Sequence, residues 1–412
     1  MSNKVVLAYS GGLDTSVSIK WLQEKYGFKV VTLTLDLGQR DDFQKIEERA
    51  YATGAVKHYQ VDAREEFVSR FVFPSIKANG LYEDKYPLST ALGRPLIAEK
   101  LVEIAELEEA EAVAHGCTGK GNDQVRFDVT VRALNPSIRV IAPVREFNMT
   151  RDEELKYALS RDVPVESKSS VYSVDQNLWG RSIEGGPLED PNVEPPEDAF
   201  EWVVPVERAP DNPTYVEIGF EGGVPTSING VSMSGLDLVE YLNRLGGANG
   251  VGVVDHLEDR LVGIKSREVY EAPAALVLIE AHRALEKAVL TRWELNFKST
   301  VEREWAWLVY SGLWVEPLRR DLEAFNEATQ SRVCGTVKVK LFKGSFRVVG
   351  VSSEFSLYKP RLATYSSGSV FDQKASIGFV ELWGLQSRIA NEVLAQHGKS
   401  GRAWKKAEQI LG

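Results

Sequence analysis

Short apolar runs alternate with longer segments of helical spacing through the first 160 residues or so. The apolar runs lie at residues 5–8, 30–35, 56–61, 112–115 and 139–143, and the segment 95–109 is an example of the helical spacing. Runs of this length are typical of buried strands, whereas a repeat of three to four residues is typical of helices. The alternation predicts a doubly wound α/β domain over residues 1–165, with helices on both faces of a parallel sheet.

The pattern changes after about residue 165. Residues 185–213 are dense in Pro, Glu and Asp, which indicates an exposed connection. Residues 214–220 alternate like a strand, Asn229-Gly230 predicts a hairpin turn, and a second hairpin is expected over 337–349 with its turn at Lys343-Gly344. Helical segments are expected from Ser234 to Gly246-Gly247, over 272–290 and over 301–310. Residues 166–371 therefore read as an α+β domain.

The last segment, residues 372–412, carries an apolar stripe at helical spacing. The stripe consists of Phe379, Leu382, Leu385, Ile389 and Val393. Such a stripe needs a surface to cover it, either within its own subunit or on another copy of the chain. We expect a C-terminal helix here that packs either on its own subunit or on another copy of the chain.

Composition narrows the class of protein. The chain has 412 residues, a formal net charge of −10 and only two cysteines, Cys117 and Cys334. A negative total argues against a nucleic-acid footprint, and two distant cysteines argue against a disulfide scaffold or a zinc cluster. The N-terminal residues enter a strand without a basic or long apolar leader, and no membrane-length apolar stretch follows. We expect a cytoplasmic protein that acts on small molecules and not on nucleic acid or membrane.

A glycine turn stands between the first apolar run and the helical pattern at 17–22. Its sequence is Ser10-Gly11-Gly12-Leu13-Asp14-Thr15-Ser16. Adjacent glycines can take positive φ and turn their N–H groups inward, and three hydroxyls add donors at the helix N-terminus. The turn predicts a phosphate site, with a simple strand-to-helix connection as the alternative. For Asp14, capping of the helix is the alternative to a ligand role.

Two common nucleotide motifs are missing from the sequence. Residues 116–121, Gly-Cys-Thr-Gly-Lys-Gly, lack the Walker A spacing and have glycine after the lysine. The dinucleotide fingerprint is also missing after the first strand. These observations disfavour γ-phosphate transfer and nicotinamide chemistry.

The turn resembles the loop of the ATP pyrophosphatases, which cleave ATP between its α- and β-phosphates. A second segment, 114–127, is similar to a loop of the argininosuccinate synthetase family, with Cys117 where alanine is common. Tyr86, Arg94-Pro95 and the segments 173–179 and 263–270 extend this resemblance over nearly the whole chain. The resemblance implies an adenine nucleotide alpha hydrolase-like sheet, a synthetase domain and a C-terminal oligomerisation helix in a homotetramer.

The resemblance also implies a reaction. It joins citrulline to aspartate while ATP is cleaved to AMP and pyrophosphate through a citrullyl-adenylate, in arginine biosynthesis or the urea cycle. ATP would enter with Mg²⁺, whose protein ligands the sequence does not identify. No enzyme nucleophile is required, in agreement with the absence of a recognisable Ser-His-Asp or Cys-His arrangement in the motifs. Catalysis by this ligase would come from alignment and electrostatics.

Site residues follow from matching the family pattern position by position. ATP would be held by Ala8, Tyr9, Ser10, Gly11, Gly12, Leu13, Asp14, Thr15, Ser16, Leu35 and Gly116. Substrate aspartate would be held by Thr118, Asn122 and Asp123. Citrulline would be held by Tyr86, Thr90, Ala91, Asn122, Arg126, Ser173, Ser182, Glu258 and Tyr270.

Some of these positions have alternative interpretations. Some relatives carry serine where Ala91 stands, so Thr90 or Ser89 is the alternative citrulline contact. Arg126 by itself would read as a surface salt bridge. His115 and Cys117 border the nucleotide loop, and we expect a satisfied core imidazole and a small packing residue there. The competing functions are another adenylating ATP pyrophosphatase and a nucleotide sensor without catalysis.

Overall fold

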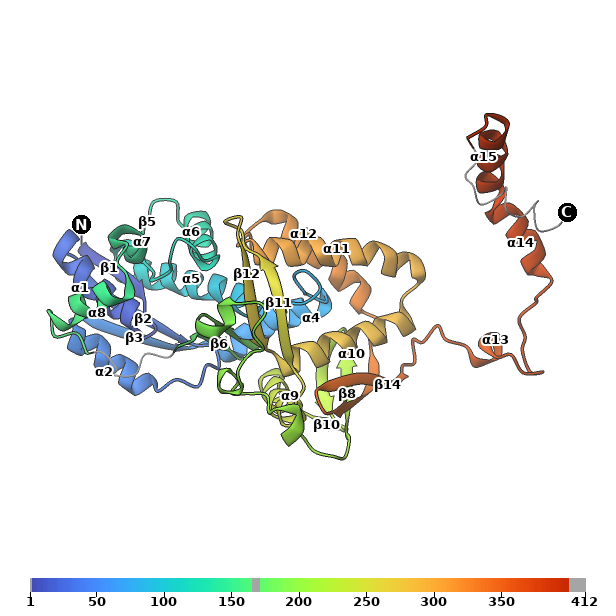
Figure 1. Ribbon diagram of the computed structural model, residues 1–412, viewed down its shortest axis with the longest axis horizontal. Coiled ribbons are helices and arrows are strands. Elements are labelled where there is room, and N and C mark those ends of the chain that lie inside the picture. The colour runs from blue at the N-terminus through green and yellow to red at the C-terminus, as the bar shows by residue number, and fades with distance from the viewer. Residues whose placement is uncertain (1, 165–170, 400–412) are drawn as a thin grey trace. The chain divides into compact units, whose positions relative to one another are not determined.

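A computed structural model describes residues 2–164 and 171–399 (Figure 1). It contains two compact units, Met1–Leu357 and Tyr358–Gly412. The domain boundary expected at 165/166 lies outside the described residues, as does the 400–412 end of the expected C-terminal segment.

The first unit begins with the parallel sheet that the apolar runs predict. Its strand order is β3-β2-β1-β4-β5, and every pairing in it is parallel. The five expected strands are confirmed, as β1 Ser2–Ala8, β2 Lys29–Asp36, β3 Lys57–Asp62, β4 Ala110–Ala114 and β5 Arg139–Ile141.

Alternation along β1 explains why helices cover both faces. Val5 and Leu7 pack into one core with residues of α1 (Leu13–Tyr26) and α2 (Phe43–Thr53), whereas Val6 packs into a second core with α5 (Ser89–Leu107). In a strand, successive side chains point to opposite faces, so one apolar run supplies both cores. Figure 1 shows α5 and α2 on opposite sides of the sheet.

The helix expected over 95–109 begins earlier than its proline suggests. It starts at Ser89, after Leu88 in the left-handed region (φ 64°), and Pro95 lies inside it. The Tyr86 hydroxyl accepts the backbone N–H groups of Thr90 (2.9 Å) and Ala91 (3.4 Å). First-turn amides have no partner within a helix, so a buried phenol from the preceding turn stabilises a start that local sequence signals do not reveal.

Two antiparallel sheets follow. One has the order β10-β9-β8-β13-β14 and contains both predicted hairpins, whose turns at Asn229-Gly230 and Lys343-Gly344 have positive φ throughout. The other has the order β11-β12-β7-β6 and was not predicted, because its strands are polar and partly exposed. The strands are β6 Ser173–Asn177, β7 Gly180–Glu184, β8 Thr214–Glu221, β9 Val224–Ile228, β10 Val231–Ser232, β11 Val253–Asp259, β12 Lys265–Glu271, β13 Gly335–Phe342 and β14 Ser345–Ser352.

The helices of this part match the expectations with one extension and one omission. The helix expected to begin at residue 301 begins nine residues earlier, because Thr291 and Glu294 form a capping box. The helix at 317–330 was not predicted. The connection 185–213 is mostly exposed, and the buried Glu271 carboxylate accepts N–H groups from Glu201, Trp202 and Val203. The helices are α9 Gly235–Ala248, α10 Pro273–Val289, α11 Arg292–Tyr310 and α12 Pro317–Gln330.

Short elements complete the unit. They are α3 Arg64–Phe67, a π turn at Val68–Val72, α4 Phe73–Lys77, α6 Asp123–Leu134, α7 Pro143–Phe147, α8 Arg151–Leu159 and 3-10 turns at Gly186–Glu189, Glu197–Ala199 and Val206–Arg208.

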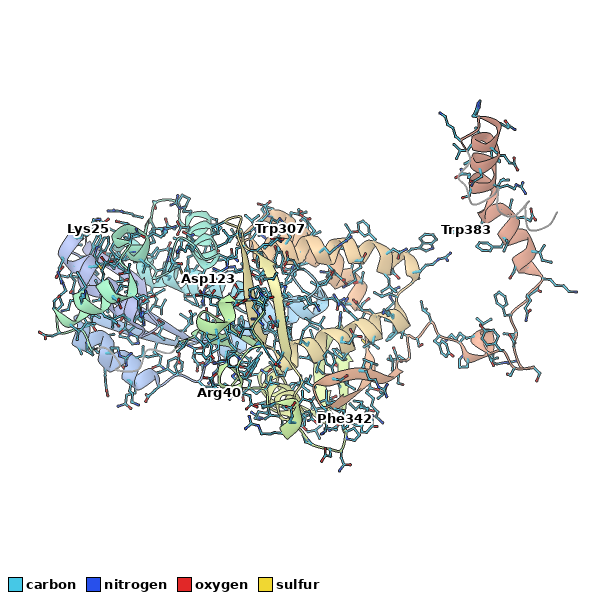
Figure 2. The ribbon with its side chains drawn as sticks, in the orientation of Figure 1. Lys25, Arg40, Asp123, Trp307, Phe342 and Trp383 are labelled. Carbon is cyan, nitrogen blue, oxygen red and sulfur yellow. The ribbon has the colours of Figure 1, made fainter. Side chains whose placement is uncertain are left out.

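The second unit contains α13 Pro360–Ala363, α14 Ala375–Trp383 and α15 Leu385–Gln396. The expected tail helix is thus two helices that meet at Gly384. Four residues of the apolar stripe are exposed, from Leu382 at 74% to Val393 at 46%, and Leu385 is half-buried. Trp383 is exposed as well (Figure 2). Among the described helices, none is both long and apolar enough to cross a membrane.

Candidate active site

A cavity of about 700 Å³ lies at the carboxyl ends of β1, β2 and β4, where parallel sheets bind ligands. The second, antiparallel part of the unit closes it with residues of β6, β7, β11 and β12. The expected site residues that line it are Ala8, Tyr9, Ser10, Gly12, Asp14, Thr15, Leu35, Tyr86, Thr90, Gly116, Thr118, Asn122, Asp123, Arg126, Ser173, Ser182, Glu258 and Tyr270.

Four of the expected site residues do not line the cavity. Gly11 forms the turn (φ 77°), and its carbonyl accepts from Arg49. Ser16 is buried against the Tyr9 hydroxyl at 2.9 Å, and Leu13 packs against the small cluster of Val17, Ala158 and Val163. Ala91 is fully buried, and the neighbouring Thr90 lines the cavity at this point.

The glycine turn differs from expectation in one respect. Only Gly11 has positive φ, since Gly12 has φ −73° and ψ 172°. Gly12 is the N-cap of α1, and the Ser10 and Thr15 hydroxyls lie 3.3 Å apart beside it. The turn therefore places hydroxyls and the free N–H groups of a helix start on the cavity wall.

Asp14 does not cap the helix with its carboxylate. It lies in the first turn of α1 and pairs with Arg151 at 2.8 Å. The pKa of Glu154 rises to about 8, because burial and then the neighbouring Asp14 carboxylate disfavour its charge. Asp14, Glu154 and Arg151 therefore lie together beside the glycine turn.

The second loop lies directly against the first. A Cβ at Gly116 would lie only 2.8 Å from the Thr15 methyl, so this close approach requires glycine. His115 is a satisfied core residue, stacked on Phe127 and bonded through Nε2 to Asp128 at 2.8 Å. Burial raises the pKa of Cys117 to about 12, which fits a packing role for this residue.

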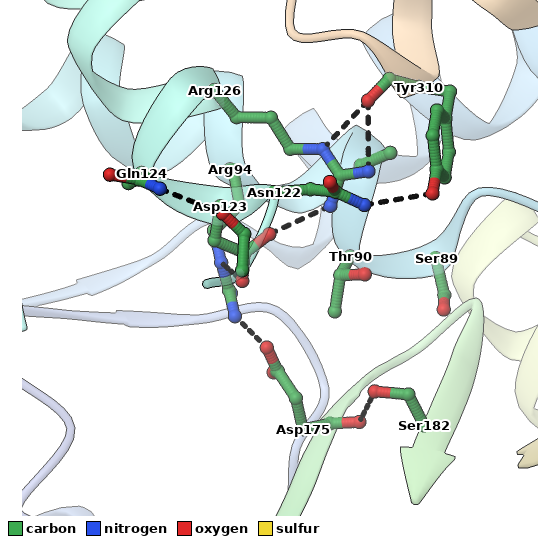
Figure 3. A network of polar contacts seen from close by, with 12 residues as sticks. Ser89, Thr90, Arg94, Asn122, Asp123, Gln124, Arg126, Asp175, Ser182 and Tyr310 are labelled. Atoms are coloured by element: carbon green, nitrogen blue, oxygen red, sulfur yellow. Dashed lines mark hydrogen bonds and ion pairs between the residues drawn. The ribbon is translucent and has the colours of Figure 1, made fainter. Parts of the chain in front are cut away.

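A row of charges crosses the cavity wall (Figure 3). Asp123 accepts from Arg94 Nε and from Arg126 Nη1, each at 2.8 Å, and Arg94 also pairs with Asp175 of β6. Burial would raise the pKa of Asp123, but the two guanidinium groups outweigh it and hold the pKa at about 2. Arg126 is 3% exposed, which excludes the surface salt bridge as its role.

Arg126 uses one edge of its guanidinium inside the protein. Its Nε and Nη2 donate to the Tyr310 carbonyl at 3.1 and 2.9 Å. A two-bond contact with a substrate carboxylate, as the sequence predicts, would therefore use the remaining N–H groups of Nη1 and Nη2.

Glu258 of β11 is a buried carboxylate of the cavity. It accepts from the hydroxyls of Tyr270 and Tyr310, both at 2.5 Å. Burial opposes its charge, yet the His256 imidazole 3.6 Å away, the hydrogen bonds from both tyrosines and the charge of Arg126 leave its pKa below the ordinary value. Glu258 is thus an anion held in place on a largely buried wall.

Aromatic stacking orders the same wall. The rings of Tyr86 and Tyr270 lie 4.4 Å apart and nearly parallel, and the Tyr86 hydroxyl is 2.5 Å from that of Thr90. At the nucleotide end, the Leu35 carbonyl accepts from Gln39 at 2.6 Å, so Gln39 also belongs to the wall.

Sequence reasoning missed Tyr310, Asp175 and His256 as parts of the site. Asp175 lies inside segment 173–179 and Arg94 precedes Pro95, both in parts of the chain that carry the family resemblance, so both had a local signal. Tyr310 ends a helix 188 residues after Asn122, with which it shares a hydrogen bond. No spacing along the chain reveals such a pair.

Comparison with known proteins agrees with this geometry. Two family models match, the arginosuccinate synthase N-terminal HUP domain over residues 4–164 and the arginosuccinate synthase C-terminal domain over 172–390. The chain is 58% identical to an argininosuccinate synthase of Pyrococcus furiosus, over 96% of this chain and 95% of that protein. It is 52% identical to the Bacillus subtilis argininosuccinate synthase, over 99% and 98% of the two chains.

The phosphate loop, the second loop and the far wall with Glu258 occur in one cavity, and both halves of the chain match the models of one family. The chain belongs to the argininosuccinate synthase family.

Proposed function

We propose that this chain is a carbon–nitrogen ligase that condenses citrulline with aspartate to argininosuccinate, in arginine biosynthesis. ATP is consumed and becomes AMP and pyrophosphate. The observation that carries the proposal is the cavity itself, since it joins a phosphate loop to buried anionic and cationic groups suited to two amino acids. A nucleotide sensor would need only the loop.

The reaction has two steps. The ureido oxygen of citrulline attacks the α-phosphorus, a new P–O bond forms, and the bond to the β-phosphate breaks to release pyrophosphate. The aspartate amine then attacks the ureido carbon and AMP departs with the former ureido oxygen. Neither step requires a covalent bond to the protein, so alignment of the reacting groups in the cavity would lower both barriers.

The loop from Ser10 to Thr15 would hold the phosphates. The Ser10 and Thr15 hydroxyls and the N-terminus of α1 face the cavity there. ATP would enter with Mg²⁺, which offsets phosphate charge when bound. The described residues contain no cluster of three His, Cys, Asp or Glu side chains suited to a metal.

Citrulline would lie against Tyr86, Thr90, Ser173, Ser182 and Tyr270. Glu258 is a held anion of the right sign for the α-ammonium group, and the remaining N–H groups of Arg126 suit the carboxylate. Tyr86 and Tyr270 supply a flat apolar surface for the aliphatic part.

Aspartate would lie between Thr118, Asn122 and Asp123. The low pKa of Asp123 keeps it ionised toward an ammonium group, and the N-terminus of α6 favours a carboxylate.

We further propose a homotetramer in the cytoplasm. The exposed stripe on α14 and α15 supports the assembly, since burial of each such side chain contributes roughly 1.5–3 kcal/mol before ordering costs. Free thiols at Cys117 and Cys334 are compatible with a reducing compartment.

The decisive experiment omits one substrate at a time. The chain is incubated with ATP, citrulline and aspartate, and pyrophosphate, AMP and argininosuccinate are measured. Pyrophosphate release in the first turnover should require citrulline and not aspartate, while AMP release should require both. Equal ATP cleavage without citrulline would refute the adenylate mechanism, and product without ATP cleavage would refute the ligase.

A further inference from the structure

Tyr310 contacts three residues that are expected to bind substrate, although Tyr310 itself does not line the cavity. It is the last residue of α11 and is fully buried. Its side chain and its backbone face different partners, as Figure 3 shows for Asn122 and Arg126.

The hydroxyl joins Asn122 to Glu258. Asn122 Oδ1 accepts from the backbone N–H of Leu261 at 2.9 Å, so its Nδ2 faces the Tyr310 oxygen at 2.8 Å as the donor. The hydroxyl proton is then directed to Glu258 at 2.5 Å, with the Asp259 carbonyl at 3.0 Å as a secondary acceptor. Both polar atoms of Asn122 and one carboxylate oxygen are thereby fixed.

The carbonyl holds Arg126. The last four carbonyls of a helix have no partner within it, and the helix C-terminus carries partial negative charge. The Tyr310 carbonyl takes two N–H groups of Arg126, which places a cation at that end. The Arg126 guanidinium also lies 5.2 Å from the centre of the Tyr310 ring.

Two more features make this contact close and rigid. Gly312 has φ 79°, and a Cβ there would lie 3.0 Å from Arg126 Cα and 3.1 Å from its N. The Tyr82 ring stacks on Tyr310 with centroids 3.5 Å apart and an interplanar angle of 8°. The end of α11 therefore presses directly on the first turn of α6.

We propose that Tyr310 is the positioning residue of the citrulline site, because it aligns Glu258 and Asn122 through its hydroxyl and Arg126 through its carbonyl. This inference rests on the proposed function. Tyr310 acts through the three residues and needs no contact of its own with the substrate.

The first test removes only the hydroxyl. In Tyr310→Phe, KM for citrulline should rise roughly 10- to 100-fold, because a hydrogen bond to a charged group is lost. The ATP Kd and kcat should change less than about three-fold, because the phosphate loop and both steps are otherwise intact. Tyr82→Phe is the matched control, since it removes a hydroxyl bonded to the Asp259 carbonyl from the same stack.

A pH profile distinguishes positioning from packing. Among the groups near Glu258, His256 of β11, Tyr270 of β12, Tyr310 of α11 and Arg126 of α6 favour its ionised form, whereas the like charge of Glu83 opposes it. The phenols of Tyr82 and Tyr86 also lie within reach of its charge. Loss of the Tyr310 hydroxyl should therefore raise the pKa of Glu258. The acid limb of kcat/KM for citrulline should move to higher pH in Tyr310→Phe and stay in place in Tyr82→Phe.

The second test separates the backbone contact. Gly312→Ala should push the Tyr310 carbonyl away from Arg126 and raise KM for citrulline roughly 10-fold or more. Gly230→Ala is the control, because Gly230 has the same φ of 79° and its Cβ would meet nothing within 4 Å. The control carries the backbone strain without the displacement.

The outcomes separate this inference from the function. If the unaltered chain makes no argininosuccinate, the proposed function fails and the inference with it. If the unaltered chain is active, and Tyr310→Phe and Gly312→Ala both match their controls in citrulline KM and in the acid limb, only the inference is overturned. Should Tyr310→Phe fold poorly by circular dichroism, the Gly312→Ala and Gly230→Ala comparison decides.

Discussion

Gly12→Ala tests whether the glycine turn binds phosphate. Gly12 has φ −73° and ψ 172°, which alanine adopts freely. The added Cβ would meet only the Ser10 hydroxyl, at an ordinary 3.4 Å. Any loss of ATP binding would therefore arise from the ligand and not from a clash inside the protein.

The expected magnitudes differ by property. Alanine is a poorer N-cap than glycine, so the free energy of unfolding should fall by less than about 1 kcal/mol. A methyl group on the cavity wall would keep phosphate from the backbone N–H groups. Loss of one or two charge-assisted hydrogen bonds, each worth roughly 1.5–3 kcal/mol, corresponds to an ATP Kd at least about ten-fold higher.

The assay is isothermal titration of the chain with ATP and Mg²⁺ in the absence of citrulline, beside a thermal unfolding scan. Gly119→Ala is the matched control in the second loop, where the nearest atom to a new Cβ would be Arg145 Cγ at 3.9 Å. If Gly12→Ala binds ATP within two-fold of Gly119→Ala at an unchanged melting temperature, the turn is a connection and the phosphate assignment is wrong.

Three further predictions concern stability and assembly. Lys298→Met removes the cation 3.0 Å from the buried Glu286 carboxylate and should lower the free energy of unfolding in urea by about 3–5 kcal/mol. Lys25→Met breaks an exposed ion pair and should change the free energy of unfolding by less than about 1 kcal/mol. Equal losses in the two variants would contradict this prediction. The pKa of Glu154 is about 8 in the folded chain and near 4.5 in the unfolded chain. Between these two pH values the folded state keeps the proton on Glu154 that the unfolded state has lost, so the free energy of unfolding falls as the pH rises from 4.5 to 8. Glu154→Gln should therefore match the unaltered chain at pH 4 and be more stable by roughly 1–3 kcal/mol at pH 8.5, and a pH-independent difference would count against it. Removal of residues 372–412 should reduce the mass measured by light scattering below that of a tetramer, and a full-length chain that is monomeric at micromolar concentration would reject the assembly.

Local patterns determined the parallel sheet, both hairpins and the glycine turn. A strand of four to six apolar residues, a glycine turn and a hairpin at Asn229-Gly230 depend on backbone conformation and burial over a few neighbouring residues. The phosphate loop and the second loop could be paired from sequence, because the carboxyl ends of parallel strands meet at one edge. Glu258 and Tyr270 were found only through the family resemblance, since their sheet is polar and has no clear period.

Tertiary structure alone decided how the site is held. The early start of α5 depends on the Tyr86 hydroxyl, and the orientation of Arg126 depends on a carbonyl 184 residues away. It also decided that Gly11 carries the positive φ while Gly12 stays extended. These contacts satisfy buried donors and acceptors between distant segments, and the partner of each group is set by where the packed elements bring it. The sequence therefore shows which polar and charged groups are present, whereas the tertiary structure determines which of them come into contact.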